Sequence, residues 1–305
     1  MDKGEICAAL DIGTNSTLFL LAEVDRHGVI RPILHDVRTN DLGRGIDRSG
    51  NLTRETIDLN INLLGAFNKK AEEYGAKCIR IAATEALRQA GNSEVLIRRA
   101  KEELGLDVRI ISGEEEALLT YQGVISGIDI EDDTILAADV GGGSSEIILG
   151  RGDEILYSTS LKVGAVLLDS MFVRDNLPTD GQIEKMRAYS KEVLSELPAS
   201  LLEGENRLVI CGGTASSLAA ADLGLSSYNP EKISGHVMTR SRLFEFIDQF
   251  QNCTLEQRRL IPGIGKRRAE IILPGTILIT TFLDAIDRNH YYTSERGLRY
   301  GLLTP

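Results

Sequence analysis

The sequence contains one short pattern twice: an apolar run ends in an aspartate, and a glycine with small polar residues follows at once. The pattern reads AALDIGTNST at 8–17 and AADVGGGSSE at 137–146. Asp139 follows Asp11 by 128 residues. An apolar run closed by glycine and small polar residues predicts a strand that leads into a tight turn. The repeat therefore predicts a chain built from two copies of one unit.

Around each aspartate the sequence predicts the same order of elements. In the first half we expect strands at 5–11, 18–24, 29–37, 77–84 and 107–112, and helices from Thr53, over 93–104 and from Glu114. In the second half we expect strands at 134–140, 146–150, 154–161 and 207–213, a helix with apolar positions from Ile183 to Leu197, and a final strand, serine and helix at 291–303. Strands that alternate with helices are typical of α/β proteins. The sequence thus predicts two α/β domains of one architecture.

Length and charge agree with two domains and limit the partners. A chain of 305 residues exceeds one ordinary core, so we place one domain at 1–127 and another at 128–305, joined near 123–133 where glycines and acids collect. The formal net charge of −11 disfavours nucleic acid and anionic membranes as partners, because the summed field repels them. An anionic substrate would then depend on local donors and metal ions.

The ends, the apolar stretches and the cysteines predict a cytoplasmic protein. The first residues lack the basic region and long apolar core of a signal peptide. The most apolar uncharged stretch, 271–283, has 13 residues and contains Pro274, which is short of the ~20 residues that span a bilayer. We interpret it as a largely buried helix. The four cysteines are far apart in sequence and form no C-x-x-C pair, so we expect reduced thiols rather than disulfides or a zinc site.

Three glycine-rich turns are candidate phosphate sites. Glycine lets backbone N–H groups approach a ligand closely, and converging neutral donors suit phosphate. The carboxylates beside the turns are hard oxygen ligands for Mg²⁺, which would bridge to phosphate oxygens. The third turn, in CGGTASS, lies between a strand and a helix and could accept a further phosphate or an adenosine. The candidate phosphate ligands are Gly13, Thr14, Asn15, Ser16, Gly141, Gly142, Gly143, Ser144, Gly212, Gly213 and Thr214, and the candidate metal ligands are Asp11, Asp139 and Glu146.

Three consecutive glutamates stand at the start of a predicted helix, in SGEEEALLTY. Ser112 and Glu115 have the spacing of a capping box, and acids in a first turn favour the helix dipole. Three carboxylates are more than a cap requires, and at about 100° per residue they point in three directions. The apolar positions predict that Leu118, Tyr121, Val124 and Ile125 form the core face. The periodicity alone does not select which glutamate faces a ligand.

Arginines near the predicted turns offer a donor fork for phosphate, although most arginines after a strand are simply solvated. Arg88 follows the fourth strand of the first half, and Arg268 belongs to the basic group GKRRAE. The four histidines show neither metal-ligand spacing nor a Ser-His-Asp signature, so we interpret them as structural.

The motifs DIGTNS, TEALRQA, IISGEEEA, DVGGGSSE and CGGTASSLAA, in this order, resemble the exopolyphosphatase and guanosine pentaphosphate phosphohydrolase family. This family belongs to the actin-like ATPase and sugar kinase superfamily. The resemblance covers nearly the whole chain and implies two duplicated actin-like (ribonuclease H-like) domains that face a cleft. The chain resembles a short form of the family, without the helical C-terminal region of longer members.

The resemblance also implies roles for particular residues. It makes Glu116 the general base, Arg88 a phosphate ligand, and Asp139 and Glu146 the residues for metal and phosphate. The implied reaction is Mg²⁺-dependent hydrolysis of a terminal phosphoanhydride of inorganic polyphosphate, with guanosine pentaphosphate as another candidate substrate. Two alternatives stay open: an ATP-dependent small-molecule kinase of the same superfamily, and a nucleotide-binding regulator without catalysis. The preferred chain length, the nucleotide at the third turn and the association of two copies into a homodimer are open as well.

Overall fold

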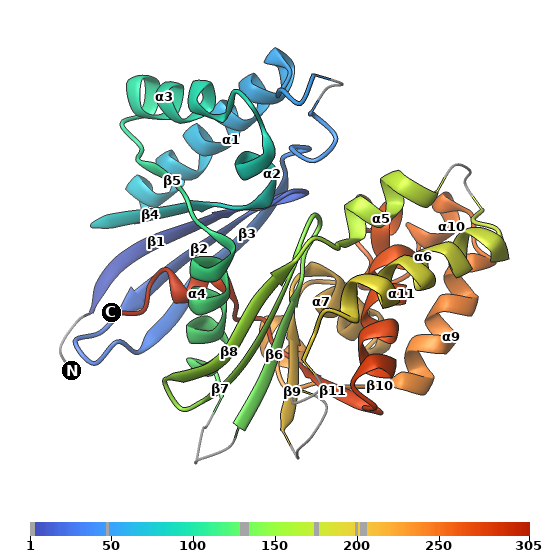
Figure 1. The fold of residues 1–305 in the computed structure, drawn as a ribbon. Coiled ribbons are helices and arrows are strands. Elements are labelled where there is room, and N and C mark those ends of the chain that lie inside the picture. Colours follow the sequence, from blue (N-terminus) through green and yellow to red (C-terminus); the bar gives the residue numbers. More distant parts are fainter. Residues whose placement is uncertain (1–3, 47–48, 129–133, 174–176, 199–200, 202–205) are drawn as a thin grey trace. The chain divides into compact units, whose positions relative to one another are not determined.

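The computed structural model describes residues 4–46, 49–128, 134–173, 177–198, 201 and 206–305 (Figure 1). The chain forms two compact units: unit 1 is Met1–Ile128 with Arg296–Pro305, and unit 2 is Asp129–Glu295. The last ten residues thus pack with the first unit, whereas the predicted boundary placed all of 128–305 in the second. Part of the predicted joint, 129–133, lies outside the described residues.

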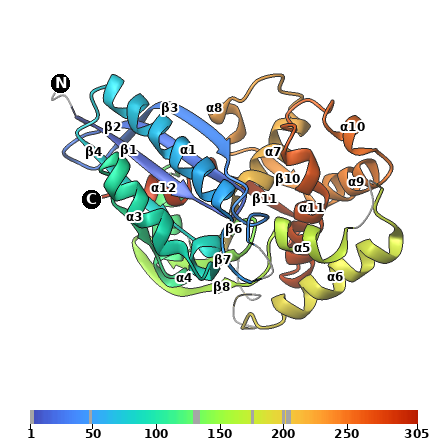
Figure 2. The ribbon, with the colours of Figure 1, turned by 90° about the horizontal axis from the view of Figure 1, so that it is seen from above.

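Unit 1 is a five-stranded mixed sheet with helices packed against it. Its strands are β1 (Glu5–Ile12), β2 (Ser16–Val24), β3 (Ile30–Thr39), β4 (Cys78–Ala83) and β5 (Val108–Ile110). Its helices are α1 (Arg54–Glu73), α2 (Glu85–Gln89), α3 (Ser93–Leu104), α4 (Gly113–Ile125) and α12 (Leu298–Gly301). Helices α1 and α3 lie side by side over one face of the sheet (Figures 1 and 2).

Unit 2 has a six-stranded mixed sheet and more helices. Its strands are β6 (Thr134–Val140), β7 (Ser145–Arg151), β8 (Glu154–Leu161), β9 (Arg207–Cys211), β10 (Val237–Thr239) and β11 (His290–Thr293). Its helices are α5 (Ala165–Phe172), α6 (Asp180–Leu194), α7 (Gly213–Asp222), α8 (Pro230–Ile233), α9 (Arg240–Gln251), α10 (Leu255–Arg258) and α11 (Arg268–Ala285).

The strand order confirms the predicted duplication. The first sheet runs β3-β2-β1-β4-β5, and the second runs β8-β7-β6-β9-β11 with β10 added at its edge. In each sheet, in the order given, the first three strands pair antiparallel, the fourth pairs in parallel with the third, and the fifth pairs in parallel with the fourth. The strands expected at 77–84 and 207–213 are β4 and β9, which occupy the same place in the two sheets. Both units are therefore α/β domains of one topology.

Helix α11 is the buried centre of unit 2, as the apolar stretch 271–283 predicted. Fourteen of its residues, from Ala269 to Leu283, are buried, and it packs against α5, α6, α7 and α9. Thr276 and Thr280 satisfy their hydroxyls by donating to carbonyls one turn back in the same helix. In the described part of the chain, no helix is both long and apolar enough to cross a membrane.

Two glycines allow α4 and α12 to cross closely inside unit 1. A Cβ on Gly123 would overlap the carbonyl of Gly297, whose carbon would lie 2.7 Å away. A Cβ on Gly301 would overlap the carbonyl of Leu119, whose carbon would lie 2.5 Å away. These obstacles are backbone atoms, so a larger residue would have to move a helix. The crossing fixes the final helix to the helix that carries the three glutamates.

A disulfide joins Cys7 of β1 to Cys78 of β4, which corrects the expectation of four reduced thiols. The cysteines are 71 residues apart, but they are direct partners in the parallel pairing of the two strands, with Cα atoms 4.9 Å apart. Spacing along the sequence does not reveal such a pair, because the proximity comes from the sheet. Cys211 and Cys253 are free. The cytoplasmic location remains a prediction.

Candidate active site

The Asp-Ile-Gly and Asp-Val-Gly segments form equivalent hairpin turns in the two units. In unit 1 the N–H of Gly13 donates to the carbonyl of Ser16 at 3.0 Å, and in unit 2 Gly141 donates to Ser144 at 3.1 Å. Each turn therefore has two residues at its tip, Thr14 and Asn15 in one and Gly142 and Gly143 in the other. The predicted correspondence of the two motifs holds at the level of single hydrogen bonds.

Carbonyl oxygens at the tips of these turns accept hydrogen bonds from other parts of the chain, whereas the N–H groups at the tips do not donate to the described residues. The carbonyl of Thr14 accepts from Gly43, and that of Gly142 accepts from Val166 and Leu167 at the start of α5. For the tip N–H groups no acceptor is found among the described residues. Backbone N–H groups need a partner, whether solvent or a ligand. The tips therefore retain the donor capacity that the phosphate prediction requires; the four tip residues are Thr14, Asn15, Gly142 and Gly143.

In unit 2 a row of polar side chains crosses four neighbouring strands. Asp139 on β6 is paired with Glu146 on β7, and Glu146 is paired with Ser160 on β8. On the other side Asp139 is paired with Cys211 on β9. Directly paired residues point to the same face of a sheet. The Ser160 hydroxyl donates to Oε1 of Glu146 at 2.7 Å, and Glu146 is 2% exposed.

The equivalent row of unit 1 contains a single acid. Asp11 on β1 is paired with Leu18 on β2 and with Ala82 on β4. The duplication thus preserves the aspartate, but it places leucine where unit 2 has Glu146. Mg²⁺ binds oxygen ligands and commonly uses one or two carboxylates with waters and substrate phosphates. The Asp139 and Glu146 pair fits such an ion, while Asp11 belongs to the other unit.

The described residues contain no group of three or more His, Cys, Asp or Glu side chains arranged to hold a metal ion. Asp139 and Glu146 therefore remain predicted metal ligands that form a pair and not a larger cluster. Next to them, burial raises the pKa of the Cys211 thiol well above its usual value, and the nearby carboxylates, first Asp139, raise it further. Cys211 thus remains a neutral thiol, which is hydrogen-bonded to Asp139.

The third glycine turn connects β9 to α7 and adjoins Asp139. Gly212 has a φ of +94°, and a Cβ there would lie 2.5 Å from Oδ1 of Asp139. A Cβ on Gly213 would overlap the guanidinium of Arg268, whose Cζ would lie 2.7 Å away. Thr214 is fully buried and packs against Gly275 of α11, and its backbone lies at the start of α7; its role as a phosphate ligand stays a prediction.

Arg268 brings a cation to the acidic row of unit 2. It is the first residue of α11 and lies beside Gly213 and Asp139. Burial lowers the pKa of its guanidinium to about 10, and the charge of Asp139 offsets part of that effect. The GKRRAE group suggested that a basic residue lies near a turn. The packing of α11 against α7 determines that Arg268, of the three basic residues in that group, lies beside the third glycine turn.

Glu116 is the buried residue among the three consecutive glutamates. It is 8% exposed, whereas the side chain of Glu115 is 40% exposed and pairs with Arg109. Ser112 caps α4 by accepting from the N–H of Glu115, but the reciprocal half of the predicted capping box is absent. The core face of α4 contains Tyr121 and Val124 as expected. Leu118 is 41% exposed, so its predicted place on that face was wrong.

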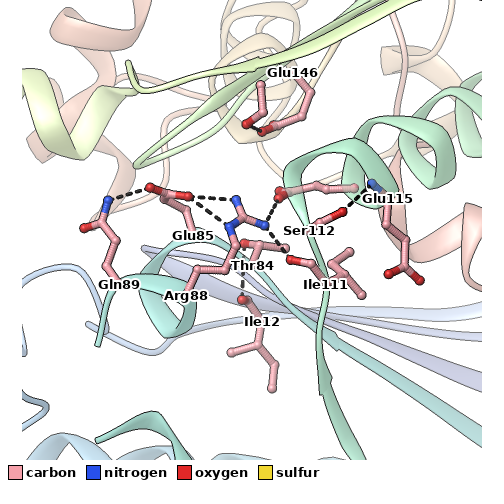
Figure 3. Close-up of polar contacts among 11 residues, drawn as sticks. Ile12, Thr84, Glu85, Arg88, Gln89, Ile111, Ser112, Glu115 and Glu146 are labelled. Carbon is pink, nitrogen blue, oxygen red and sulfur yellow. Dashed lines mark hydrogen bonds and ion pairs between the residues drawn. The ribbon is translucent and has the colours of Figure 1, made fainter. Parts of the chain in front are cut away.

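Arg88 lies at the centre of an ion network (Figure 3). Its Nη1 donates to Oε2 of Glu116 at 2.7 Å and to the carbonyl of Ile111 at 2.8 Å, and its Nε and Nη2 donate to Glu85. Burial lowers the pKa of Arg88, but Glu116 and Glu85 outweigh it, so the pKa is raised. The structure therefore joins two predicted residues directly. Whether Arg88 also binds phosphate remains a prediction.

The candidate residues of each unit come from the carboxyl ends of parallel strands. In unit 1, Asp11 is near the end of β1, Arg88 follows β4 and Glu116 follows β5. The N–H of Thr84 donates to Ile12, and that of Ile111 donates to Ala83, so these strand ends adjoin. Ligands of α/β sheets bind outside the carboxyl ends of the strands. The fold thus explains how residues 105 positions apart share one edge.

Two copies of this sheet order, each with an Asp-Ile/Val-Gly hairpin, define a two-domain α/β protein of the actin-like class. Residues 20–305 match the model of the Ppx/GppA phosphatase family. The chain therefore belongs to the Ppx/GppA phosphatase family, which confirms the predicted family and enzyme class.

Curated relatives agree with this membership. Exopolyphosphatase 2 of Mycobacterium tuberculosis is 29% identical over 282 residues, which cover 89% of this chain and 88% of that protein. The bifunctional 3-dehydroquinate synthase/phosphatase of Fusobacterium nucleatum is 28% identical over 97% of this chain. The present chain spans 46% of the length of that bifunctional relative.

Solved structures show the same fold. A Ppx/GppA enzyme of Aquifex aeolicus is 29% identical, with a TM-score of 0.82 and 98% of each chain covered. An exopolyphosphatase of Cytophaga hutchinsonii is 27% identical, with a TM-score of 0.87, and the match covers 97% of this chain and 96% of that one.

Proposed function

We propose that this protein removes the terminal phosphate of inorganic polyphosphate by Mg²⁺-dependent hydrolysis, with Glu116 as the general base. The observation that carries the proposal is the buried carboxylate of Glu116, fixed by Arg88 at the carboxyl edge of the first sheet. Family membership and the relatives named exopolyphosphatase support the substrate class.

In the proposed reaction the protein positions the phosphates and accepts one proton. The N–H groups at the hairpin tips donate to phosphate oxygens, as neutral donors on tight turns do. Glu116 takes a proton from water while the water oxygen attacks the terminal phosphorus, and the bond to the bridging oxygen breaks. Phosphoryl transfer depends mainly on positioning and on neutralisation of charge. Bound Mg²⁺, held by Asp139 and Glu146, would supply part of that neutralisation.

Local charge suggests short substrates. The net charge is −11, and of the two arginines described at the candidate residues, Arg268 adjoins the third turn and Arg88 is shared between two carboxylates. We do not propose an extended basic surface along which a long polyphosphate would bind. We therefore propose that short polyphosphate is handled better than chains of hundreds of units. Guanosine pentaphosphate, hydrolysed to the tetraphosphate, is the second substrate that the same chemistry would accept.

A substrate panel tests the proposal. Polyphosphates of defined length, guanosine pentaphosphate and ATP, each with Mg²⁺ and again with EDTA, are incubated with the protein, and released phosphate is measured. Release from polyphosphate that requires Mg²⁺ is expected. Turnover of ATP only after a sugar or small acid is added would instead indicate a kinase, and binding without turnover would indicate a regulator. A steep preference for the longest chains would contradict the proposed length dependence.

A further inference from the structure

Glu85 is a second buried carboxylate beside the proposed base, and it comes from a different helix. Its side chain is 10% exposed, as is that of Glu116. Oε2 of Glu85 accepts from Arg88 Nε at 3.0 Å and from Nη2 at 2.8 Å, and Oε1 accepts from Gln89. Figure 3 shows the Glu85 carboxylate between the side chains of Gln89 and Arg88, and all three residues belong to α2.

The polar side chains that the Glu85 carboxylate contacts, Arg88 and Gln89, both belong to its own helix, α2. Among the described residues its carboxylate bonds only Arg88 and Gln89. Within the described ranges it accepts no hydrogen bond from a backbone N–H, so it does not cap α2. Burial of a carboxylate is costly unless it is paired. The arrangement therefore calls for an explanation beyond the folding of one short helix, whose Ala86 and Leu87 already anchor it in the core.

The guanidinium of Arg88 divides its donors between two acids. Nε and Nη2 face Glu85, and Nη1 faces Glu116 and the carbonyl of Ile111. With Glu85 in place the guanidinium cannot rotate without breaking two charge-assisted hydrogen bonds, which are the stronger kind. The negative charge of Glu85 also balances the positive charge of Arg88. Glu116 is thus held in place by a cation that is already neutralised from its other side.

We propose that Glu85 is a positioning residue for the hydrolysis, and that it acts through Arg88 to orient the Glu116 carboxylate and preserve its ability to accept a proton. The inference rests on the proposed function. Glu85 touches neither water nor phosphate in this account. Its loss leaves Arg88 free to turn and leaves an unbalanced cation beside the base, and both changes weaken the base.

The experiment compares kcat and KM for short polyphosphate in Glu85→Gln, Glu85→Asp and a matched control, Glu115→Gln. The control makes the same change on a glutamate that pairs with an arginine, Arg109, at the surface. Glu85→Gln is expected to lower kcat roughly 10- to 100-fold, the size seen when a residue that orients a metal ligand is lost. KM is expected to stay level or fall, because a negative charge is removed near a polyanion. Glu85→Asp, which keeps the charge, should recover part of kcat.

A double-mutant cycle tests whether the effect passes through Arg88. In an Arg88→Met background, Glu85→Gln should change kcat by less than about twofold, since residues of one network are not additive. Thermal unfolding of every variant checks that kcat refers to folded protein. An unchanged kcat in Glu85→Gln, an equal loss in Glu85→Asp, or full additivity with Arg88→Met would overturn the inference. A wild-type protein inert on every phosphoanhydride would instead refute the proposed function, and this inference with it.

Discussion

Replacement of Glu116 by glutamine removes the proposed base while it keeps the shape of the side chain. In the wild-type protein Nη1 of Arg88 donates to Oε2 of Glu116 at 2.7 Å. The amide oxygen of glutamine can accept the same hydrogen bond, so the network loses a charge rather than a contact. Loss of a general base lowers rates by about 10² to 10⁴. That range corresponds to about 2.7 to 5.4 kcal/mol in the activation free energy.

The assay for this prediction is steady-state phosphate release from tripolyphosphate with saturating Mg²⁺. We expect kcat to fall by that factor in Glu116→Gln, while KM stays level or falls because one negative charge has gone. Glu115→Gln is the control, since its carboxylate faces Arg109 and not Arg88. A Glu116→Gln variant that is folded and retains more than a tenth of the wild-type kcat would refute the general-base role.

Three further variants probe binding, packing and charge. If Arg268 binds phosphate in the ground and transition states alike, Arg268→Ala should raise KM more than it lowers kcat; the reverse pattern would contradict that role. Gly123→Ala should lower the melting temperature by about 3–10 °C, since overpacking costs about 1–3 kcal/mol, whereas Gly181→Ala, where a Cβ meets nothing within 4 Å, should not. Burial, with Arg299 and Arg296, lowers the pKa of His35 to about 4. The unfolded chain therefore binds a proton that the folded protein does not between about pH 6.5 and 4, so stability falls as the pH falls through that range, and His35→Gln should flatten the fall in melting temperature.

Much of the fold could be predicted because it depends on local patterns. Thr53 was expected to begin a helix, and it is the N-cap of α1. The Thr53 hydroxyl accepts a hydrogen bond from the N–H of Thr56. The strands around Asp11 and Asp139 were expected from apolar runs closed by turns, and their pairing confirms the duplication. The strand predicted at 207–213 ends earlier, at Cys211, because Gly212 already has a positive φ.

What could not be predicted depends on contacts between distant segments. The Cys7 and Cys78 pair follows from the register of β1 against β4, which no spacing rule reveals. The packing of α4 determines that Glu116, and not its two neighbouring glutamates, is buried. The apolar periodicity predicted that Leu118 is on the core face, but its side chain is exposed. The network that joins Glu85 to Glu116 needs the ends of β4 and β5 to meet, so the sequence could suggest its members only one at a time.

The most direct test of the central claim is hydrolysis of defined-length polyphosphate in ¹⁸O-labelled water. The oxygen content of the released phosphate and the length of the remaining chain are both measured by mass spectrometry. Base-assisted attack of water on the terminal phosphorus predicts one solvent oxygen in each phosphate released at first, and a chain shortened by one unit. Phosphate without solvent oxygen, or chains cut internally, would contradict the account.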